Sequence, residues 1–108
     1  MKFGIILQTN KPEHIWNTLR LGIAALKAGH TVRLVLMNEG VEIDNISDSA
    51  DFDISKKIET FRKLGGAMVA CEGCLKLRGK SVCEVAPITH MEETVKMIET
   101  SDKVLVFG

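Results

Sequence analysis

The sequence carries no net charge and few aromatic residues. Its 14 lysines and arginines balance its 14 aspartates and glutamates, and only 5% of its residues are aromatic. Proteins that coat nucleic acid usually have a pI above about 9, and single-strand binding requires aromatic side chains interleaved with basic ones. The pI of about 6.8 and the scattered aromatic residues therefore predict no direct contact with nucleic acid.

Long apolar runs and nucleotide-binding motifs are also missing. No stretch reaches the ~18 apolar residues of a membrane span, and the first residues do not resemble a secretory signal. We therefore expect a cytoplasmic protein without membrane contact. Neither G-x-G-x-x-G after the first apolar run nor G-x-x-x-x-G-K-[ST] occurs. This disfavours a dinucleotide or a nucleoside triphosphate, and we expect no cofactor.

The apolar content is nevertheless sufficient for one hydrophobic core. The 108 residues are 45% hydrophobic and 26% charged, which is typical of an ordered globular protein rather than a disordered one. A chain of this length fits one domain and not two. We expect residues 1–108 to form a single domain.

Short apolar runs alternate with amphipathic segments along the chain. Runs typical of strands covered on both faces occur at residues 3–7, 31–37, 67–70 and 103–107. Apolar stripes at helical spacing are formed by Ile15, Leu19, Ile23 and Leu26, by Ile54, Ile58 and Phe61, and by Met91, Val95 and Ile98. The alternation predicts a three-layer α/β/α sandwich with a mostly parallel sheet, flavodoxin-like or Rossmann-like. The expected strand order is 2-1-3-4-5, or a shortened version of it.

Cap and turn residues delimit these segments. Asn10 and a Thr89-His90-Met91-Glu92 capping box are predicted to begin helices. Gly29 is predicted to end a helix in the left-handed conformation, and Gly40 to provide a turn with positive φ. Residues 39–53 carry six acids and no base, which favours a mobile, solvated loop with little helix over an acidic docking surface.

Three cysteines, Cys71, Cys74 and Cys83, lie within thirteen positions. An odd, clustered count without an export signal is a poor disulfide framework and fits a chemical site better. Cys71 follows an apolar strand, and residues 74–78 are predicted to form a short helix. Ligands bind at the carboxyl ends of strands in open α/β sheets, and the N–H groups that begin a helix favour anions. We therefore expect the pKa of the Cys71 thiol to lie below its usual value of about 8.5.

The Cys71-x-x-Cys74 spacing admits four interpretations. Both thiols can be small buried side chains without chemistry. A zinc site would need four ligands, for which Cys71, Cys74, Cys83 and His90 are the candidates, although one paired knuckle is present where two are usual. A thioredoxin-like dithiol usually lies near an N-terminal βαβ unit, whereas this pair follows a third strand. The remaining interpretation is a nucleophilic cysteine that carries sulfur.

The order of three motifs resembles the DsrE/DsrF-like family of small sulfur-relay proteins, which includes TusD-type subunits. The motifs are Leu7-Gln8-Thr9-Asn10 leading to Gly29-His30-Thr31-Val32, then Leu36-Met37-Asn38-Glu39-Gly40-Val41, and Cys71 followed by Arg78-Gly79. The resemblance covers nearly the whole chain. It implies that Cys71 accepts sulfane sulfur as a persulfide and passes it to a partner thiol. It also implies sulfur donor and acceptor proteins as partners, and a homo-oligomer of three or six copies.

Roles for the neighbouring residues follow from this hypothesis. Cys74 is expected to act as a resolving thiol, although many family members lack a cysteine there. Lys76 and Arg78 are expected to stabilise the anion at Cys71. Gly73, having no Cβ, is expected to let its backbone approach the terminal sulfur.

Other residues at the same sheet edge are less informative. Asn38 and Gly40 follow the second strand and are expected to line the Cys71 pocket, because parallel strands end at one edge. His90 is expected to face solvent rather than act as a base, and Cys83 receives no role. Two alternative functions remain open: a CxxC thiol–disulfide redox protein, and a non-catalytic oligomeric binding or assembly module.

Overall fold

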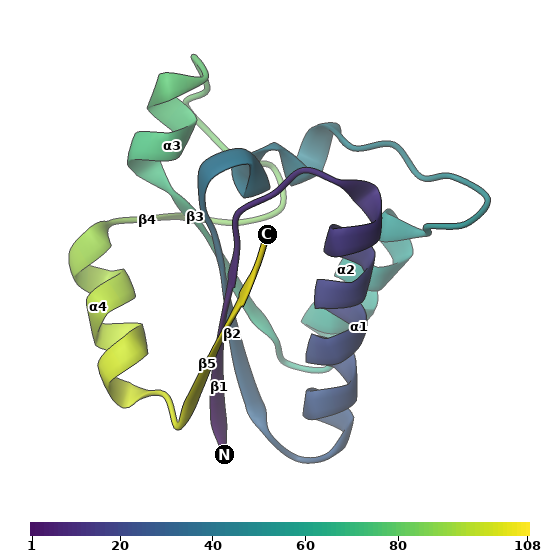
Figure 1. The fold of residues 1–108 in the computed structure, drawn as a ribbon, viewed down its shortest axis with the longest axis vertical. Coiled ribbons are helices and arrows are strands. Elements are labelled where there is room, and N and C mark those ends of the chain that lie inside the picture. The colour runs from purple at the N-terminus through teal and green to yellow at the C-terminus, as the bar shows by residue number, and fades with distance from the viewer.

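The four predicted strands and one further short strand, β4, form one parallel sheet. The computed structural model describes residues 1–108, and its strands are β1 (Lys2–Leu7), β2 (Thr31–Leu36), β3 (Ala67–Cys71), β4 (Ile88–Thr89) and β5 (Lys103–Phe107). Every pairing between named strands is parallel. Because parallel strands all point the same way, their carboxyl ends meet at one edge, the upper edge in Figure 1. The α/β fold with a mostly parallel sheet is confirmed.

The strand order corrects the prediction of 2-1-3-4-5. The sheet runs β4-β3-β2-β1-β5, so β2 rather than β1 lies next to β3. β5 pairs with the other side of β1, where Ile5 stands opposite Leu105. Apolar runs show that β1 and β2 are both covered strands, but they do not say which of the two neighbours β3. The local sequence pattern therefore left this choice undetermined.

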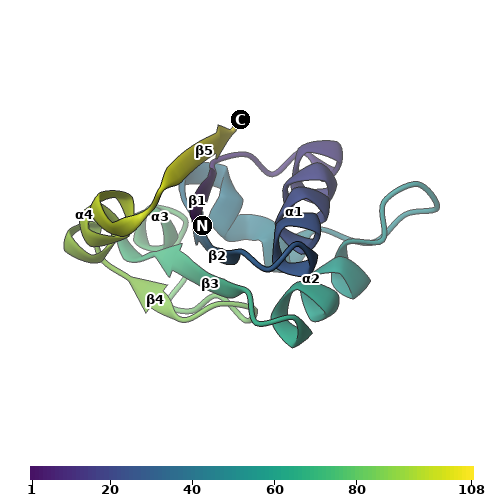
Figure 2. The ribbon, with the colours of Figure 1, turned by 90° about the horizontal axis from the view of Figure 1, so that it is seen from below.

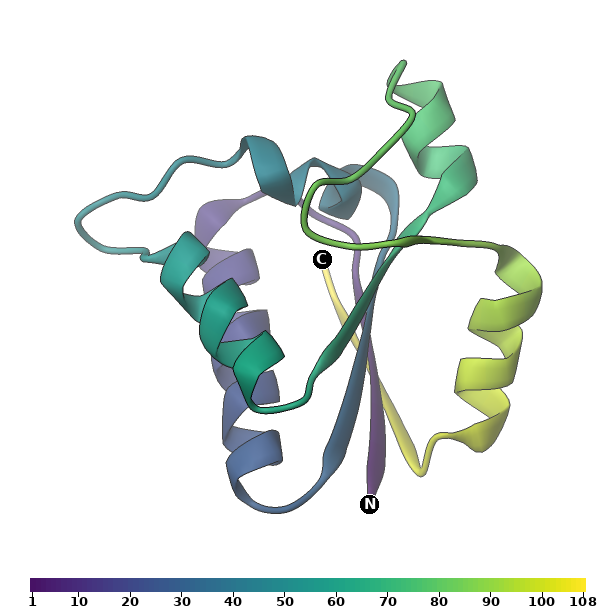
Figure 3. The same cartoon turned by 180° about the vertical axis from the view of Figure 1, so that it is seen from behind.

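Helices cover both faces of the sheet, which confirms the three-layer arrangement. Helices α1 (Pro12–Lys27) and α2 (Ile54–Lys63) lie on one face and α4 (Met91–Thr100) on the other, as Figure 2 shows. Two short helices, the 3-10 helix η1 (Asn38–Asn45) and α3 (Glu72–Leu77), lie at the carboxyl ends of the strands (Figure 3). No helix combines the length and apolar character needed to cross a bilayer.

The main core lies between the sheet and the α1–α2 layer. Ile15 and Leu19 of α1 and Phe61 of α2 are fully buried, as their spacing predicts. A Cβ on Gly22 would lie 2.8 Å from the Phe61 ring, so the glycine lets the two helices approach each other. Burying each such side chain contributes about 1.5–3 kcal/mol. This layer fixes the strands whose ends carry the cysteines.

Helix α4 buries a different face from the predicted one. Met91, Val95 and Ile98 were expected to point inward, but they are 54%, 52% and 44% exposed. Met97 and Thr94 are buried instead, and the Met97 sulfur lies against Gly4 of β1 where a Cβ would collide with it. The absence of a Cβ at Gly4 thus makes room for the Met97 side chain, through which α4 packs on β1. The remaining apolar stripe of α4 is left facing outward.

The acidic segment after β2 is more ordered than predicted. Its first part forms η1, in which Val41 and Ile43 are buried. Asn38, rather than Gly40, has the positive φ, 51°. Gly40 is required for another reason, because a Cβ there would overlap the Leu7 carbonyl oxygen of β1. The segment is therefore anchored to the carboxyl ends of the strands through its buried apolar residues.

The predicted helix caps are partly wrong. Lys11 and His90 occupy the N-cap positions of α1 and α4, and neither helix has a side-chain cap hydrogen bond. Asn10 instead donates through Nδ2 to Glu42 of η1, at 3.3 Å. Gly29 does adopt the left-handed conformation, with φ of 92°, at the end of α1 as predicted.

Candidate functional site

Cys71 is the last residue of β3 and the N-cap of α3. It is opposite Thr89 of β4 in the parallel pairing, and its backbone is still extended, with φ of −65° and ψ of 120°. The chain turns into α3 directly afterwards, so the thiol stands at the carboxyl edge of the sheet. The residue is 6% exposed. The sequence-based position of Cys71, at a strand end leading into a helix, agrees with this geometry.

A surface pocket of about 260 Å³ opens beside Cys71. Its lining consists of Cys71, Glu72, Gly73, Thr89, His90, Met91 and Glu92. The pocket exists because the short pairing of β4 with β3 brings the start of α4 beside the start of α3. Three larger hollows, of about 340, 440 and 370 Å³, are lined by no cysteine. The Cys71 pocket is therefore the one surface pocket that a cysteine lines.

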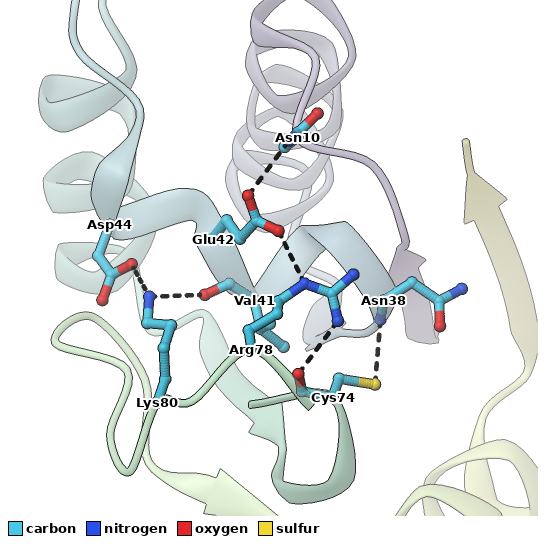
Figure 4. Close-up of polar contacts among 8 residues, drawn as sticks. All are labelled: Asn10, Asn38, Val41, Glu42, Asp44, Cys74, Arg78 and Lys80. Carbon is cyan, nitrogen blue, oxygen red and sulfur yellow. Dashed lines mark hydrogen bonds and ion pairs between the residues drawn. The ribbon is translucent and has the colours of Figure 1, made fainter. Parts of the chain in front are cut away.

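Cys74 lies one turn along α3 and points toward η1. Its sulfur accepts a hydrogen bond of 3.1 Å from the Asn38 backbone N–H (Figure 4). Burial and the neighbouring Cys71 thiol raise the pKa of Cys74, and the Asn38 N–H opposes them in part. Both cysteines are free thiols. Cys74 is consequently protonated at neutral pH. This state suits a resolving thiol better than an attacking nucleophile.

Arg78 ties the end of α3 to η1. Its Nε donates to Glu42 Oε2 at 2.7 Å, and its Nη1 donates to the Cys74 carbonyl oxygen at 3.1 Å (Figure 4). The hydrogen bond from Arg78, followed by that from Asn10, holds the pKa of the Glu42 carboxyl below its usual value. Glu42 is thus a carboxylate at neutral pH. Arg78 thus donates hydrogen bonds to Glu42 and to the α3 backbone.

A second ion pair, between Lys80 and Asp44, also joins the segment after α3 to η1. Lys80 Nζ lies 2.6 Å from Asp44 Oδ1, and Asp44 Oδ2 accepts the Glu84 backbone N–H at 3.0 Å. Burial raises the pKa of Asp44, but the hydrogen bonds from Lys80 and Glu84 outweigh it and the net pKa is lowered. We call Glu42, Asp44, Arg78 and Lys80 the η1–α3 clamp. The clamp fixes α3 and the following loop against η1.

The other predicted site residues divide between the pocket and its surroundings. Gly73 lines the pocket, and apart from its chain neighbours and its own helix backbone nothing lies within 4 Å of the position its Cβ would take. Lys76 is 72% exposed and reaches only Glu72, at 3.5 Å. Asn38 contacts Cys74 through its backbone, and its side chain donates to Gln8 Oε1 at 3.1 Å. Gly40 is buried under β1 and does not line the Cys71 pocket.

His90 is half exposed to solvent and also lies at the cysteine site. It lines the Cys71 pocket, and its Nδ1 lies 3.5 Å from Glu72 Oε1. The sequence favoured a solvent-facing position over a role as a base, and the side chain is 52% exposed. The pairing of β4 with β3 also places residue 90 near residues 71 and 72. A strand of two residues leaves almost no pattern in the sequence. The sequence therefore did not show that His90 and Cys71 line the same pocket.

Cys83 lies away from the pocket, in the loop between α3 and β4. It forms an antiparallel bridge with Ala86, and burial raises the pKa of its thiol. The structure gathers no three histidine, cysteine, aspartate or glutamate side chains in an arrangement that could hold a metal ion. The zinc interpretation of Cys71, Cys74, Cys83 and His90 therefore has no ligand set.

Comparison with known proteins agrees with the fold. The YchN protein from E. coli is 25% identical and superposes with a TM-score of 0.83, over 99% of this chain and 100% of that one. BT1422 from Bacteroides thetaiotaomicron, a conserved protein of unknown function, is 15% identical with a TM-score of 0.77, over 97% and 93% of the two chains, and shows likeness of fold alone. No curated protein matches the sequence. A model of the DsrE/DsrF-like family matches residues 1–107, and the chain therefore belongs to that family.

Proposed function

We propose that the protein is a sulfur carrier that accepts sulfane sulfur as a persulfide on Cys71 and passes it to a partner thiol. The observation that carries the proposal is the position of Cys71. It ends a central strand of a DsrE-type sheet and lines a pocket that opens to solvent. Membership of the family favours a role in sulfur relay.

The chemistry needs one thiolate and room for one additional sulfur. The Cys71 thiolate attacks the outer sulfur of a donor persulfide, a Cys71–S–SH bond forms, and the donor leaves as its thiolate. An acceptor thiolate then attacks the outer sulfur and regenerates the Cys71 thiolate. The pocket of about 260 Å³ that Cys71 and Gly73 line offers room for the added sulfur. Stabilisation of these anions by Lys76 and Arg78 stays a prediction, because both side chains already pair with carboxylates.

Cys74 determines how long the persulfide lasts. Its thiolate can attack the inner sulfur of the Cys71 persulfide, forming a Cys71–Cys74 disulfide and releasing hydrosulfide. The raised pKa of Cys74 keeps this thiolate scarce, and the Asn38 N–H holds its sulfur toward η1. The persulfide is thereby preserved until an acceptor arrives.

The partners in this proposal are donor and acceptor proteins in the cytoplasm, where thiols stay reduced. A second copy of the chain is a further partner. Val95 and Ile98 of α4 and Val106 of β5 are 52%, 44% and 57% exposed, whereas parallel sheets are normally covered on both faces. We propose that copies of the chain pack against this α4–β5 face to form the oligomer that the resemblance implies.

One further function has an observation in its favour. The thiols of Cys71 and Cys74 interact, as a CxxC thiol–disulfide redox protein would require. Such a protein would cycle between dithiol and disulfide without ever holding sulfane sulfur. Catalysed reduction of a protein disulfide by the dithiol form would favour this function over sulfur transfer. A non-catalytic assembly module would need only the α4–β5 face, as its contact between copies, and no reactive thiol.

The test is the intact mass of variants after exposure to a low-molecular-weight persulfide. We expect the wild-type chain and Cys83→Ser to gain about 32 Da, one sulfur atom, and Cys71→Ser to gain none. Cys83→Ser is the matched control because it removes a buried thiol outside the pocket. Sulfur gained by Cys71→Ser but lost in Cys83→Ser would refute the assignment.

A further inference from the structure

The Cys71 pocket contains one side chain suited to proton transfer at neutral pH. Its titratable lining residues besides Cys71 are Glu72, His90 and Glu92. Ordinary carboxyl groups are already ionised at pH 7, whereas the unperturbed imidazole pKa of about 6.5 allows histidine both to accept and to release a proton there. Lys76 lies outside the lining. We propose that His90 is the proton-transfer group for Cys71 and that Glu72 positions its imidazole; this deepens the sulfur-carrier function and rests on it.

The backbone of His90 is fixed at the start of α4. Its carbonyl oxygen accepts the backbone N–H groups of Glu93 and Thr94, both at 3.1 Å. Its extended conformation, with φ of −117° and ψ of 163°, makes it the N-cap of the helix. The side chain is 52% exposed. The ring is therefore attached to a fixed backbone position and can still exchange protons with solvent.

Glu72 gives the ring an orientation. Its Oε1 lies 3.5 Å from His90 Nδ1 and 3.5 Å from Lys76 Nζ. With Nδ1 toward the carboxylate, the opposite ring nitrogen, Nε2, is the one left to exchange a proton with Cys71. A nucleophile, a base and a group that orients the base form the general arrangement of activated nucleophiles. The side chains of Glu72, Lys76 and Glu92 are the charged groups around the ring, from α3 and from α4.

The proposed steps balance without any further reactant. His90 Nε2 accepts the Cys71 thiol proton, giving a thiolate and an imidazolium. The thiolate takes the outer sulfur of the donor persulfide, and the imidazolium returns its proton to the departing donor thiolate. The net change converts one thiol and one donor persulfide into one Cys71 persulfide and one donor thiol. Sulfur transfer to the acceptor uses the same proton exchange in reverse.

The test is the pH dependence of Cys71 alkylation by iodoacetamide. The parent protein carries Cys74→Ser and Cys83→Ser, so that only one thiol reacts. We expect His90→Gln to slow the reaction about tenfold at pH 7 and to remove the His90-dependent inflection from the pH profile. Glu72→Gln should reduce the same inflection, whereas His14→Gln, an exposed histidine on α1, should leave the profile unchanged. Imidazole added to His90→Ala should restore part of the rate.

Two results would overturn the proposal. One is a His90→Gln profile within twofold of the parent at every pH; the other is an equal loss of rate in His14→Gln. If His90→Gln fails to fold, the profile of Glu72→Gln decides the question, and an unchanged profile refutes the proposal. Failure of the sulfur-carrier function is separately visible. In that case the His90-dependent inflection persists while the wild-type chain gains no sulfur from a persulfide.

Discussion

Gly40→Ala measures how closely the strand ends are packed behind the cysteine site. Gly40 of η1 lies against the end of β1, and an added Cβ would overlap the Leu7 carbonyl oxygen and approach its carbon to 3.0 Å. That oxygen also accepts the Met37 backbone N–H at 2.9 Å. Because both obstructing atoms belong to the backbone, no side-chain rotation relieves the overlap. Either η1 or the end of β1 must move.

The expected loss of stability is about 2 kcal/mol. Forcing one additional methyl group into a packed region costs about 1–3 kcal/mol, and weakening the hydrogen bond from Met37 to Leu7 adds about 0.5–1.5 kcal/mol. Replacing glycine by alanine offsets about 0.4–1 kcal/mol, because the unfolded chain loses conformational freedom. With a urea m-value of about 1.5 kcal/mol per M, the midpoint of unfolding should fall by about 1.3 M.

The assay is equilibrium unfolding in urea, followed by circular dichroism and by the fluorescence of Trp16. Coinciding transitions would validate two-state analysis. The matched control is Gly73→Ala, at an exposed position in α3 where nothing lies within 4 Å of the added Cβ. The higher helix propensity of alanine should stabilise this variant by up to about 1 kcal/mol. Our reasoning is refuted if Gly40→Ala stays within about 0.5 kcal/mol of wild type, or if Gly73→Ala is equally destabilised.

Three further predictions concern the clamp, the outer face and the second thiol. The pKa of Glu42 is lowered in the folded state, so the stability that Glu42 gives the fold is complete above the ordinary carboxyl pKa and is lost as the pH falls through the lowered pKa. The urea midpoint of the wild-type chain should therefore decline in acid, and Glu42→Gln should flatten that decline. An unchanged decline would contradict the prediction. Val95→Asp should shift sedimentation toward the monomer, and Glu99→Gln, on the same helix, should not; equal effects would refute the α4–β5 face as the contact. Cys74→Ser should lengthen the lifetime of the Cys71 persulfide severalfold and suppress hydrosulfide release, whereas an unchanged lifetime would exclude Cys74 as the resolving thiol.

The sequence predicted those features that depend on local periodicity. Apolar runs identified four strands, and the spacing of Ile15, Leu19 and Ile23 identified the buried face of α1. The same pattern placed Cys71 at a strand end. Burial of a continuous apolar run and of a helical stripe is dictated by the hydrophobic effect within each segment. These predictions therefore needed no knowledge of the partner segments.

Features that depend on distant segments escaped prediction. The stripe of Met91, Val95 and Ile98 has helical spacing, yet it is exposed. Thr94 and Met97 are buried instead, with Met97 over Gly4 of β1. The acidic content of η1 gave no sign that its Val41 and Ile43 side chains are buried. Arg78 has a carboxylate partner 36 positions away, at Glu42. His90 reached the pocket through a strand of two residues. In each case the decisive contact joins residues that no local pattern relates.

The most direct test of the central claim is the position of the added sulfur within the chain. After reaction with a persulfide and alkylation, cleavage after glutamate separates Cys71 from Cys74, because Glu72 lies between them, and Glu84 ends the segment that contains Cys83. We predict an additional sulfur of about 32 Da on the peptide that ends at Glu72 and on no other. Sulfur found on the peptide of residues 73–84, which contains both Cys74 and Cys83, with the Cys71 peptide unmodified, would contradict the assignment.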